Sequence, residues 1–309
     1  ESGARCKIKR FYGVVFGKDG KTGKLSFVTF EVTQCYDIKA IHFIFHLEVK
    51  MLEKIKKDFT TRTLVLIPIA IAINIVIGQI VYLLKLPIYL DSIGTVLVGA
   101  IAGPWAGALT GALSNLLWGI LPIVTNAYSV PFFYVALVIG LLAGYFGHLG
   151  VFEKEAPRWL SVLIGAIFFF TLTFFITAFL NLNTDETGYT TYPTPGELLS
   201  RYLIVFVISI LVGAAIGYFL LQKGGYAGLA GLATGIVAAI ISAPTAAVVF
   251  GGVTGGGTDL IVAAFRASGG NIISSVMAQG AVSDPFDKML SFMVVWLILQ
   301  SLPARFKTR

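Results

Sequence analysis

Long apolar runs separated by short polar segments dominate the chain after residue 60. A helix needs about 20 apolar residues to cross the hydrocarbon core of a bilayer. Six runs approach or exceed that length, and they predict membrane-spanning helices at 64–84, 131–147, 160–182, 200–222, 225–250 and 286–303. The pattern therefore predicts an all-α integral membrane protein.

A further apolar stretch at 86–119 contains a carboxylate, Asp91, and the pair Gly103 and Pro104. One helix of this length would measure about 51 Å, well over the roughly 30 Å of the hydrocarbon core. Glycine favours the end of a helix and proline its first turn. We therefore expect two short helices, 92–102 and 104–120, with a tight reversal between them. The whole is then a bundle of 6–8 transmembrane helices, eight if every predicted helix spans.

The segment 251–285 is long, rich in glycine and only moderately apolar. It predicts a re-entrant or outward-facing loop that carries a short amphipathic helix. Asp284 precedes Pro285 and the last apolar run, and an aspartate in that position favours the N-cap of a helix. Outside this segment, charged residues are expected at the ends of the spans.

Composition agrees with a membrane protein, because 56% of the residues are hydrophobic and 13% are charged, against roughly 25% charged in soluble domains. The net charge of +7 does not indicate a nucleic-acid partner, because the apolar part has no basic stripe with interleaved aromatic residues. Ten Lys and Arg fall on the N-terminal side of the expected spans and four on the other side. By the positive-inside rule, both termini are expected on the cytoplasmic side of the plasma membrane.

Cysteine and histidine usage excludes several kinds of site. Cys6 and Cys35 both lie in the first 50 residues, and His148 is the one histidine after residue 50. A disulfide, a cysteine nucleophile and a Cys/His metal site are therefore excluded from the apolar part, and neither a cofactor nor an enzymatic activity is expected. No GxxxxGK[ST] phosphate-binding sequence occurs, so any ATP hydrolysis belongs to partner proteins.

Residues 1–50 differ in character from 51–309, which form the predicted transmembrane helical domain. The sequence "VVFGKDGKTGKLSFVTFEV" alternates around a glycine-rich turn, which is typical of a β-hairpin. Met51 then opens "MLEKIKKDFTTRT", a basic amphipathic lead typical of the start of bacterial membrane proteins. Two explanations of the leader stay open: translated non-coding sequence or another artefact, or a small soluble β appendage.

Three segments carry a family resemblance: "LPIYLDSIGT" after the first span, "GPWAGALTGALSNLLWG" in the paired helices, and the polar "ILPIVTNAYSVP". They resemble the substrate-binding S components of energy-coupling factor (ECF) transporters, which import vitamins such as riboflavin, thiamine and biotin. The resemblance covers 60–222 and, more loosely, 225–309. It implies a small-molecule pocket near the outer membrane face, a membrane coupling subunit and two cytoplasmic ATPases as partners, and toppling of the chain during delivery.

Seven residues are candidate ligand contacts: Asp91, Thr95, Asn115, Trp118, Asn126, Tyr128 and Asp259. Asp91 precedes Thr95 by four residues, so the two can share one helix face; an N-cap role for Asp91 is the alternative. Amides and aromatic rings suit a heterocycle, but Asn115 could equally bridge two helices and Trp118 could lie in an interfacial aromatic belt. Turn formation is the alternative for the three loop residues.

The first span places Ala70, Asn74 and Gly78 four residues apart on one face. In the ECF family, small residues on the first helix face the coupling subunit, so the resemblance implies that this face docks the partner. Ordinary packing inside the bundle explains the same spacing, and both interpretations stay open.

The leading hypothesis is therefore an S component for a small vitamin-like or nucleobase-like molecule. A multi-helix membrane sensor and a self-contained secondary transporter are the alternatives. A sensor normally carries a signalling domain after its last helix, whereas a short basic tail ends this sequence at Arg309. A secondary transporter tends to carry intramembrane charges for ion coupling, and here charges are expected at span ends.

Overall fold

The computed structural model describes residues 4–15, 26–37, 53, 55–121, 126–184, 186 and 190–303. The chain forms two compact units, Glu1–Lys57 and Asp58–Arg309. Met51, the predicted start of the membrane domain, lies outside the described residues. The boundary between the units falls a few residues beyond it.

The first unit contains two strands, β1 (Ala4–Val15) and β2 (Ser26–Asp37). They pair antiparallel, from Ala4 opposite Asp37 to Val15 opposite Ser26. The two strands of the expected hairpin are therefore present, and the glycine-rich turn between them falls outside the described residues. The origin of the leader stays a prediction.

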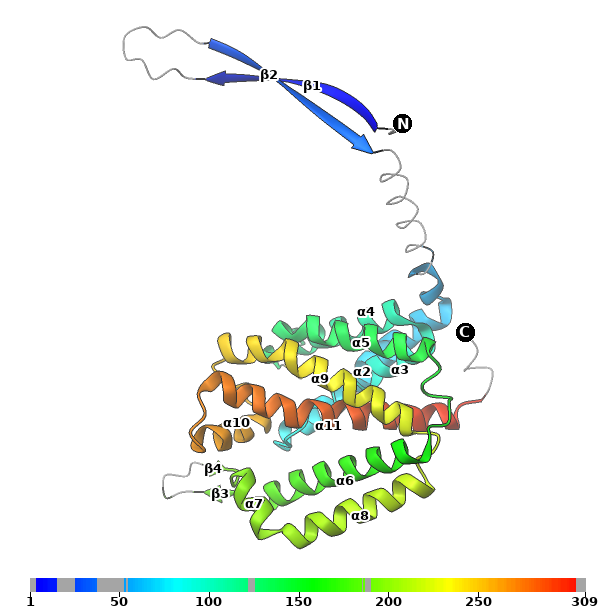
Figure 1. Cartoon of the computed structure of the whole chain (residues 1–309), viewed down its shortest axis with the longest axis vertical. Coiled ribbons are helices and arrows are strands. Elements are labelled where there is room, and N and C mark those ends of the chain that lie inside the picture. Colours follow the sequence, from blue (N-terminus) through cyan, green and yellow to red (C-terminus); the bar gives the residue numbers. More distant parts are fainter. Residues whose placement is uncertain are drawn as a thin grey trace. The chain divides into compact units, whose positions relative to one another are not determined.

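The second unit is mostly helical, with one short two-stranded sheet (Figure 1). In chain order its elements are α2 (Thr61–Leu83), α3 (Ile93–Ala102), α4 (Pro104–Ile120), η1 (Ala127–Phe132), α5 (Phe133–His148), α6 (Arg158–Leu180), β3 (Asn183–Thr184), β4 (Thr190–Thr191), α7 (Pro195–Arg201), α8 (Leu203–Phe219), α9 (Gly225–Val248), α10 (Thr258–Ala267) and α11 (Ile272–Ser301).

Several of these helices have the length and composition of membrane spans. Among the described residues, α2, η1 with α5, α6 and α9 are each long and apolar enough to cross a bilayer. The pair α7 and α8, bent by 84°, makes a fifth candidate if it counts as one span. The helical membrane fold is confirmed, and the count of six to eight spans stays a prediction.

The stretch 86–119 divides into two helices. α3 ends at Ala102, Gly103 has a φ of 122°, and α4 begins at Pro104. The carboxylate of Asp58 accepts a hydrogen bond from the Trp105 backbone N–H at 3.0 Å, which satisfies one free donor at the start of α4. α3 is only ten residues long. That α3 and α4 each cross the membrane stays a prediction.

The last helix begins much earlier than the sequence predicted. α11 runs unbroken from Ile272 to Ser301, and its N-cap is Asn271, whose Oδ1 accepts from the Ser274 backbone N–H at 2.8 Å. The N-cap prediction for Asp284 is therefore wrong, because Asp284 and Pro285 lie inside the helix. The expected short helix in 251–285 corresponds to α10.

Packing against α9 accounts for a helix that continues through proline. A Cβ built on Gly235 of α9 would lie 2.3 Å from the Pro285 Cα, so the two backbones are in direct contact there. Membrane helices tolerate proline where neighbouring helices surround the freed backbone groups. The local helix-stop signal is thus overridden by a tertiary contact.

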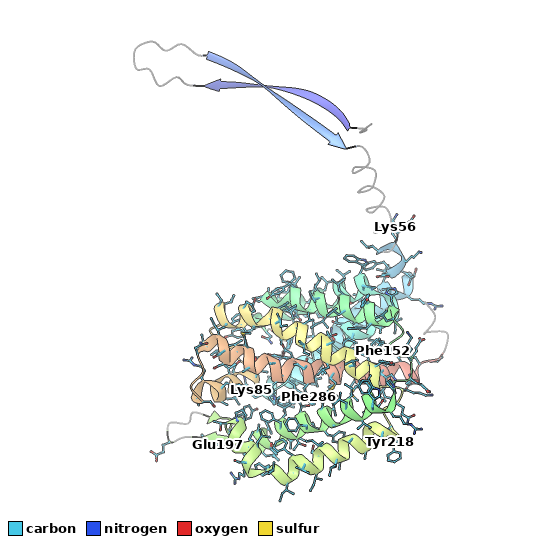
Figure 2. The ribbon with its side chains drawn as sticks, viewed as in Figure 1. Lys56, Lys85, Phe152, Glu197, Tyr218 and Phe286 are labelled. Atoms are coloured by element: carbon cyan, nitrogen blue, oxygen red, sulfur yellow. The ribbon has the colours of Figure 1, made fainter. Side chains whose placement is uncertain are left out.

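Aromatic side chains join α6 to α11 in the core. Phe286 of α11 is 2% exposed, and its ring lies 5.3 Å from that of Phe168 and 5.1 Å from that of Phe175, centroid to centroid. Figure 2 shows Phe286 in the interior of the helical unit, whereas Tyr218 and Glu197 lie at its edge. α8 in turn packs on α6, at the side of the bundle (Figure 1).

Candidate ligand-binding site

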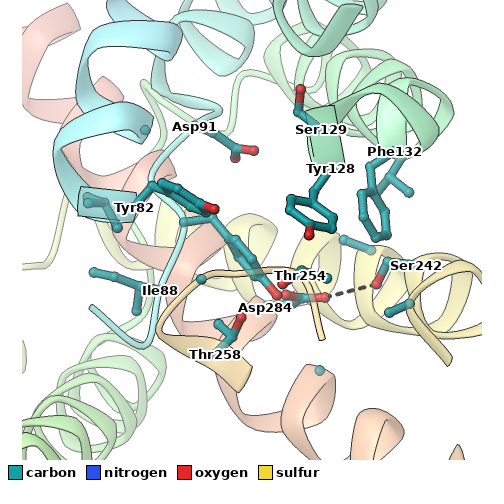
Figure 3. A pocket seen from close by; sticks show the side chains of 18 of the residues that line it. Tyr82, Ile88, Asp91, Tyr128, Ser129, Phe132, Ser242, Thr254, Thr258 and Asp284 are labelled. Atoms are coloured by element: carbon teal, nitrogen blue, oxygen red, sulfur yellow. Dashed lines mark hydrogen bonds between the residues drawn. The ribbon is translucent and has the colours of Figure 1, made fainter. Parts of the chain in front are cut away.

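A cavity of about 130 Å³ lies among α2, α4, η1, α9, α10 and α11. One water needs roughly 10–15 Å³ on this scale, so the cavity has room for a small organic molecule. Its walls combine apolar groups with a few converging polar ones, which is the usual make-up of a ligand pocket. Figure 3 shows Tyr82, Asp91, Tyr128, Asp284 and Thr254 around it.

The segment 84–92, here the α2–α3 loop, forms one wall of this cavity. Its backbone includes two non-glycine residues with positive φ, Lys85 at 53° and Leu90 at 49°. Such conformations persist only where the surroundings impose them. At Leu90, Asp287 of α11 imposes it, because its Oδ1 accepts from the backbone N–H groups of Tyr89 at 3.2 Å and Leu90 at 2.6 Å.

Asp91, Asp287 and Lys288 form a charged triad where this loop meets α11. The Lys288 ammonium lies 2.5 Å from Asp287 Oδ2 and 3.3 Å from Asp91 Oδ1. The side chains of Lys288 and Asp287 are 5% and 0% exposed, so these charges are held almost without water. Buried charges persist only when paired and hydrogen-bonded, and the triad meets that condition.

Two members of the triad lie inside a helix that the sequence predicted to begin only at 286. Asp287 and Lys288 lie at the middle of the 30-residue α11. Asp91 lies before α3 rather than in it, and the N-cap residue of that helix is Ser92. Neither the shared helix face with Thr95 nor the N-cap role for Asp91 is observed.

Asp284, one turn before Lys288 on α11, also lines the cavity. It is 5% exposed, and its Oδ2 accepts from the Ser242 hydroxyl of α9 at 3.4 Å, the dashed line in Figure 3. No other hydrogen bond to this carboxylate occurs among the described residues. A buried carboxylate has acceptor sites for several donors, so Asp284 keeps capacity for a ligand.

Another wall of the cavity, which includes the Trp118 ring, is built from α2 and α4. Trp118 is 6% exposed, and its indole Nε1 donates to Gln79 Oε1 of α2 at 2.8 Å. Burial of this ring argues against the interfacial-belt alternative. Gly78 makes room for the ring, because a Cβ there would lie 2.8 Å from it. Asn115, one turn earlier on α4, lines the cavity too.

The element η1 supplies Asn126 and Tyr128. Asn126 is 9% exposed, and its side-chain Oδ1 has no hydrogen-bond donor within reach among the described residues. Tyr128 is 40% exposed and packs edge-on against Phe250 after α9, with ring centroids 5.4 Å apart. The two residues place a free acceptor and an aromatic face on the same cavity.

The segment 249–257, here the α9–α10 loop, closes another side. Asp259 accepts from the Thr254 and Gly255 backbone N–H groups at 3.0 and 2.7 Å, and from the Thr254 hydroxyl at 2.8 Å. This carboxylate therefore organises the loop, which favours the turn alternative. The Lys85 ammonium donates to the Gly255 carbonyl, so the two loops touch at the edge of the cavity.

Six of the seven residues expected to contact ligand line this one cavity: Asp91, Asn115, Trp118, Asn126, Tyr128 and Asp259. Thr95 does not, because its hydroxyl accepts from the Asn74 side chain inside the bundle at 2.8 Å. Sequence reasoning missed Tyr89, Ser242, Gln279, Asp284 and Lys288. For two of them, the sequence did contain a signal: Asp284 and Lys288 are four residues apart, a spacing that places both on one face of α11.

The proposed docking residues lie inside the bundle. Ala70 is 0% and Asn74 1% exposed. The Asn74 amide donates to the hydroxyls of Thr95 and Ser114 at 2.8 and 2.9 Å, and its Oδ1 accepts from the Gly94 backbone N–H at 2.7 Å. Gly78 contacts Trp118. These contacts favour the packing alternative.

A second cavity, of about 390 Å³, lies between α6 and α7 on one side and α9, α10 and α11 on the other. Thr171 is the one residue of its lining with a polar side chain. It therefore offers no converging polar groups to orient a ligand. The first cavity is the better candidate site, although it is the smaller of the two.

Comparison with known proteins identifies the first half of the helical unit. Residues 62–182 match the family model described as ECF transporter, substrate-specific component. This segment is similar to the substrate-specific components of ECF transporters. The match confirms the resemblance seen in the sequence, and that family is one of transporter components, not of enzymes. Together with the apolar helices, it indicates a multi-pass membrane protein. No curated protein and no solved structure matches the chain.

The cavity combines the ECF segment with the rest of the chain. Asp91, Asn115, Trp118, Asn126 and Tyr128 lie within 62–182. The opposite wall, with the carboxylates of α10 and α11, lies after the matched residues. Any ligand in this cavity therefore meets residues that the family model does not cover.

Proposed function

We propose that the chain is the substrate-binding subunit of an importer, and that it captures a small vitamin-like or nucleobase-like molecule in the 130 Å³ cavity. The observation that carries this is the convergence of Asn115, Trp118 and Tyr128 of the ECF segment on one cavity. Aromatic faces and amide groups of this kind suit a flat heterocycle.

Energy for uptake comes from partner proteins in this proposal. The family match supports a membrane coupling subunit and two cytoplasmic ATPases as those partners. We expect cells that express the chain with such a module to accumulate one labelled compound from a panel of riboflavin, thiamine, biotin and nucleobases. Accumulation should stop when the ATPases are made unable to hydrolyse ATP. Uptake that persists in those cells would contradict the proposed energy source.

The cavity faces the exterior of the cell in this proposal, with both termini in the cytoplasm. The excess of basic residues on the N-terminal side of the spans supports this orientation. In a variant with Cys6 and Cys35 replaced by serine, a cysteine at the exposed Glu186 should react with a membrane-impermeant maleimide in intact cells. A cysteine at the exposed Lys154 should not. The opposite labelling pattern would reverse the orientation.

The charged triad favours a second candidate function, a secondary transporter. Charges inside a membrane bundle commonly couple substrate movement to an ion gradient. Here, however, Asp287 also holds the backbone of the α2–α3 loop, which gives the triad a structural reason to exist. Proteoliposomes that contain the chain without ATPases decide between the two. Accumulation of a panel compound under a proton gradient would support the secondary transporter, and its absence the importer subunit.

A further inference from the structure

The wall of the cavity carries more carboxylates than cations. Among the described residues that line it, Asp91, Asp259 and Asp284 are acidic and Lys288 is basic. Lys288 is shared between Asp91 and Asp287, and Asp259 is satisfied by the backbone of the α9–α10 loop. Asp284 is thus the lining carboxylate that keeps the most unused acceptor capacity.

Two buried oxygen acceptors in this cavity lack adequate donors. Asp284 has the Ser242 hydroxyl at 3.4 Å, a long hydrogen bond. Asn126, which lines the same cavity, has a buried Oδ1 with no donor within reach among the described residues. Burying acceptors without donors is costly, and a ligand that brings N–H groups removes that cost at both positions.

The residue one turn before Asp284 on its own helix has no side chain. Gly280 lies one turn earlier on α11, and a Cβ built there would stand 3.7 Å from Asp284 Oδ2. Tyr82, Tyr128 and Phe132 line the same cavity (Figure 3). Aromatic faces attract cations and stack with flat rings, so they complement a ligand that is both flat and positively charged.

From these features we infer that the substrate is a flat organic cation with N–H donors, and that Asp284 is the residue that selects its charge. This inference rests on the proposed function, because it names the substrate class of the same cavity. Asp284 pairs with the cationic group, and Asn126 Oδ1 accepts a second N–H. The aromatic side chains contact the faces of the ring.

An anionic substrate fits the same wall poorly. Its natural partner would be Lys288, which already serves two carboxylates. Binding an anion there would draw the ammonium away from Asp287 and Asp91 and leave buried charge unpaired, which is strongly unfavourable. An anion would also face Asp284 one turn away on α11. Asp284 and Lys288, one turn apart on α11, therefore both disfavour an anionic substrate.

Three ring compounds of nearly equal shape test this inference: benzamidinium, benzamide and benzoate. Each is titrated against the detergent-solubilised full chain, and its dissociation constant is measured by ligand-observed NMR. We expect benzamidinium to bind about tenfold more tightly than benzamide, since a desolvated charge-assisted hydrogen bond is worth about that factor. Benzoate should bind most weakly. Equal binding of benzamide or benzoate, or no binding of benzamidinium, would overturn the inference.

Variants assign the preference to Asp284. Asp284→Asn should bind benzamidinium and benzamide within about threefold of each other, because the neutral amide removes the charge but keeps the volume. Asp284→Glu should keep the wild-type order. Glu155→Gln is the matched control, because it removes a carboxylate that is 69% exposed at the surface, and it should also keep that order. A cation preference that survives in Asp284→Asn would sink the assignment.

Failure of this inference and failure of the proposed function give different results. If mass spectrometry finds an anionic or neutral compound bound to the purified chain, and the chain imports that compound, the charge assignment is wrong and the importer function stands. If the benzamidinium preference holds but no compound accumulates in cells with the ATPase module, the cation site stands and the importer function fails.

Discussion

Two contacts between separate parts of this molecule are held in different ways. α6 and α8 meet through glycine, and a Cβ built on Gly165 would lie 2.2 Å from the Gly213 carbonyl oxygen. α11 meets the α2–α3 loop through the charged triad, whose Lys288 and Asp91 are 197 positions apart in sequence. The first contact depends on close backbone packing, with the Ser209 hydroxyl donating to the Phe169 carbonyl beside it at 2.7 Å. The second depends on charges that must stay paired.

The difference teaches which contacts the site depends on. The α6–α8 contact lies beside the second, apolar cavity, and α8 presents exposed side chains such as Ile204 and Leu211, at 75% and 64%. The charged triad forms part of the wall of the first cavity. Breaking the glycine contact should therefore cost stability and spare ligand binding, whereas breaking the triad should cost both.

The largest effect is expected for Lys288→Met. It leaves the buried carboxylate of Asp287 without its cation, and breaking a buried pair in this way costs about 3–5 kcal/mol in the free energy of unfolding. Denaturant unfolding of the detergent-solubilised protein measures it. Lys223→Met is the control, because its pair with Glu155 is 3.7 Å long and exposed, and it should change stability by at most about 0.5 kcal/mol. Equal losses of unfolding free energy in the two variants would show that the triad stabilises the fold no more than an exposed ion pair does.

Asn74→Ala should come next, with a loss of about 2 kcal/mol. The substitution deletes three buried hydrogen bonds and leaves the Gly94 backbone N–H without its acceptor. The expected loss lies within the range measured for leaving a buried polar group unsatisfied. Unfolding measurements give the loss, and co-purification with a coupling subunit gives a second readout. A variant of full stability that no longer binds the coupling subunit would restore the docking interpretation of this face.

Gly165→Ala tests the α6–α8 contact and should cost about 1–3 kcal/mol, the usual penalty of overpacking. The added methyl has no room against the Gly213 backbone. Gly196→Ala on α7 is the matched control, since nothing lies within 4 Å of a Cβ there. Ligand retention should be unchanged in both variants. If retention falls in Gly165→Ala, the two regions are coupled and the comparison must be revised.

The smallest effect, about 1 kcal/mol, is expected for Thr194→Ala. Thr194 and Glu197 form a capping box at the start of α7, with hydrogen bonds of 3.4 and 2.9 Å, and losing such a cap typically costs that much. Hydrogen exchange should speed up in α7 and stay unchanged in α11. Ser200→Ala, at the other end of α7, should have less effect. Faster exchange across α11 as well would show that α7 supports the site.

Local signals in the sequence predicted most of the helices. Gly103 favours the end of a helix and Pro104 the start of one. These two preferences were enough to predict that 86–119 forms two helices, without tertiary information. The same kind of signal failed at Pro285, because contact with the α9 backbone decides the helix there. Sequence reasoning has no access to that contact.

The candidate site could also be predicted only in part, because tertiary contacts decide where some of its residues lie. Amide and aromatic residues near the expected helix ends, such as Asn115 and Trp118, were recognised from their type and position. Thr95 was included because Asp91 was taken to be helical, whereas Asp91 lies in the α2–α3 loop and pairs across the bundle. The role of Asp284 depends on where α11 begins, so it could not be seen before the helix was known.

One measurement tests the central claim, that a small molecule binds in the cavity between the ECF segment and α11. Ala243 of α9 lines this cavity, and Ala243→Phe fills it. Ala215→Phe makes the same change on the exposed face of α8. Mass spectrometry of the purified, washed proteins should find one small molecule retained by the wild type and by Ala215→Phe, and about tenfold less in Ala243→Phe. Retention of the same compound in equal amount by Ala243→Phe would contradict the account.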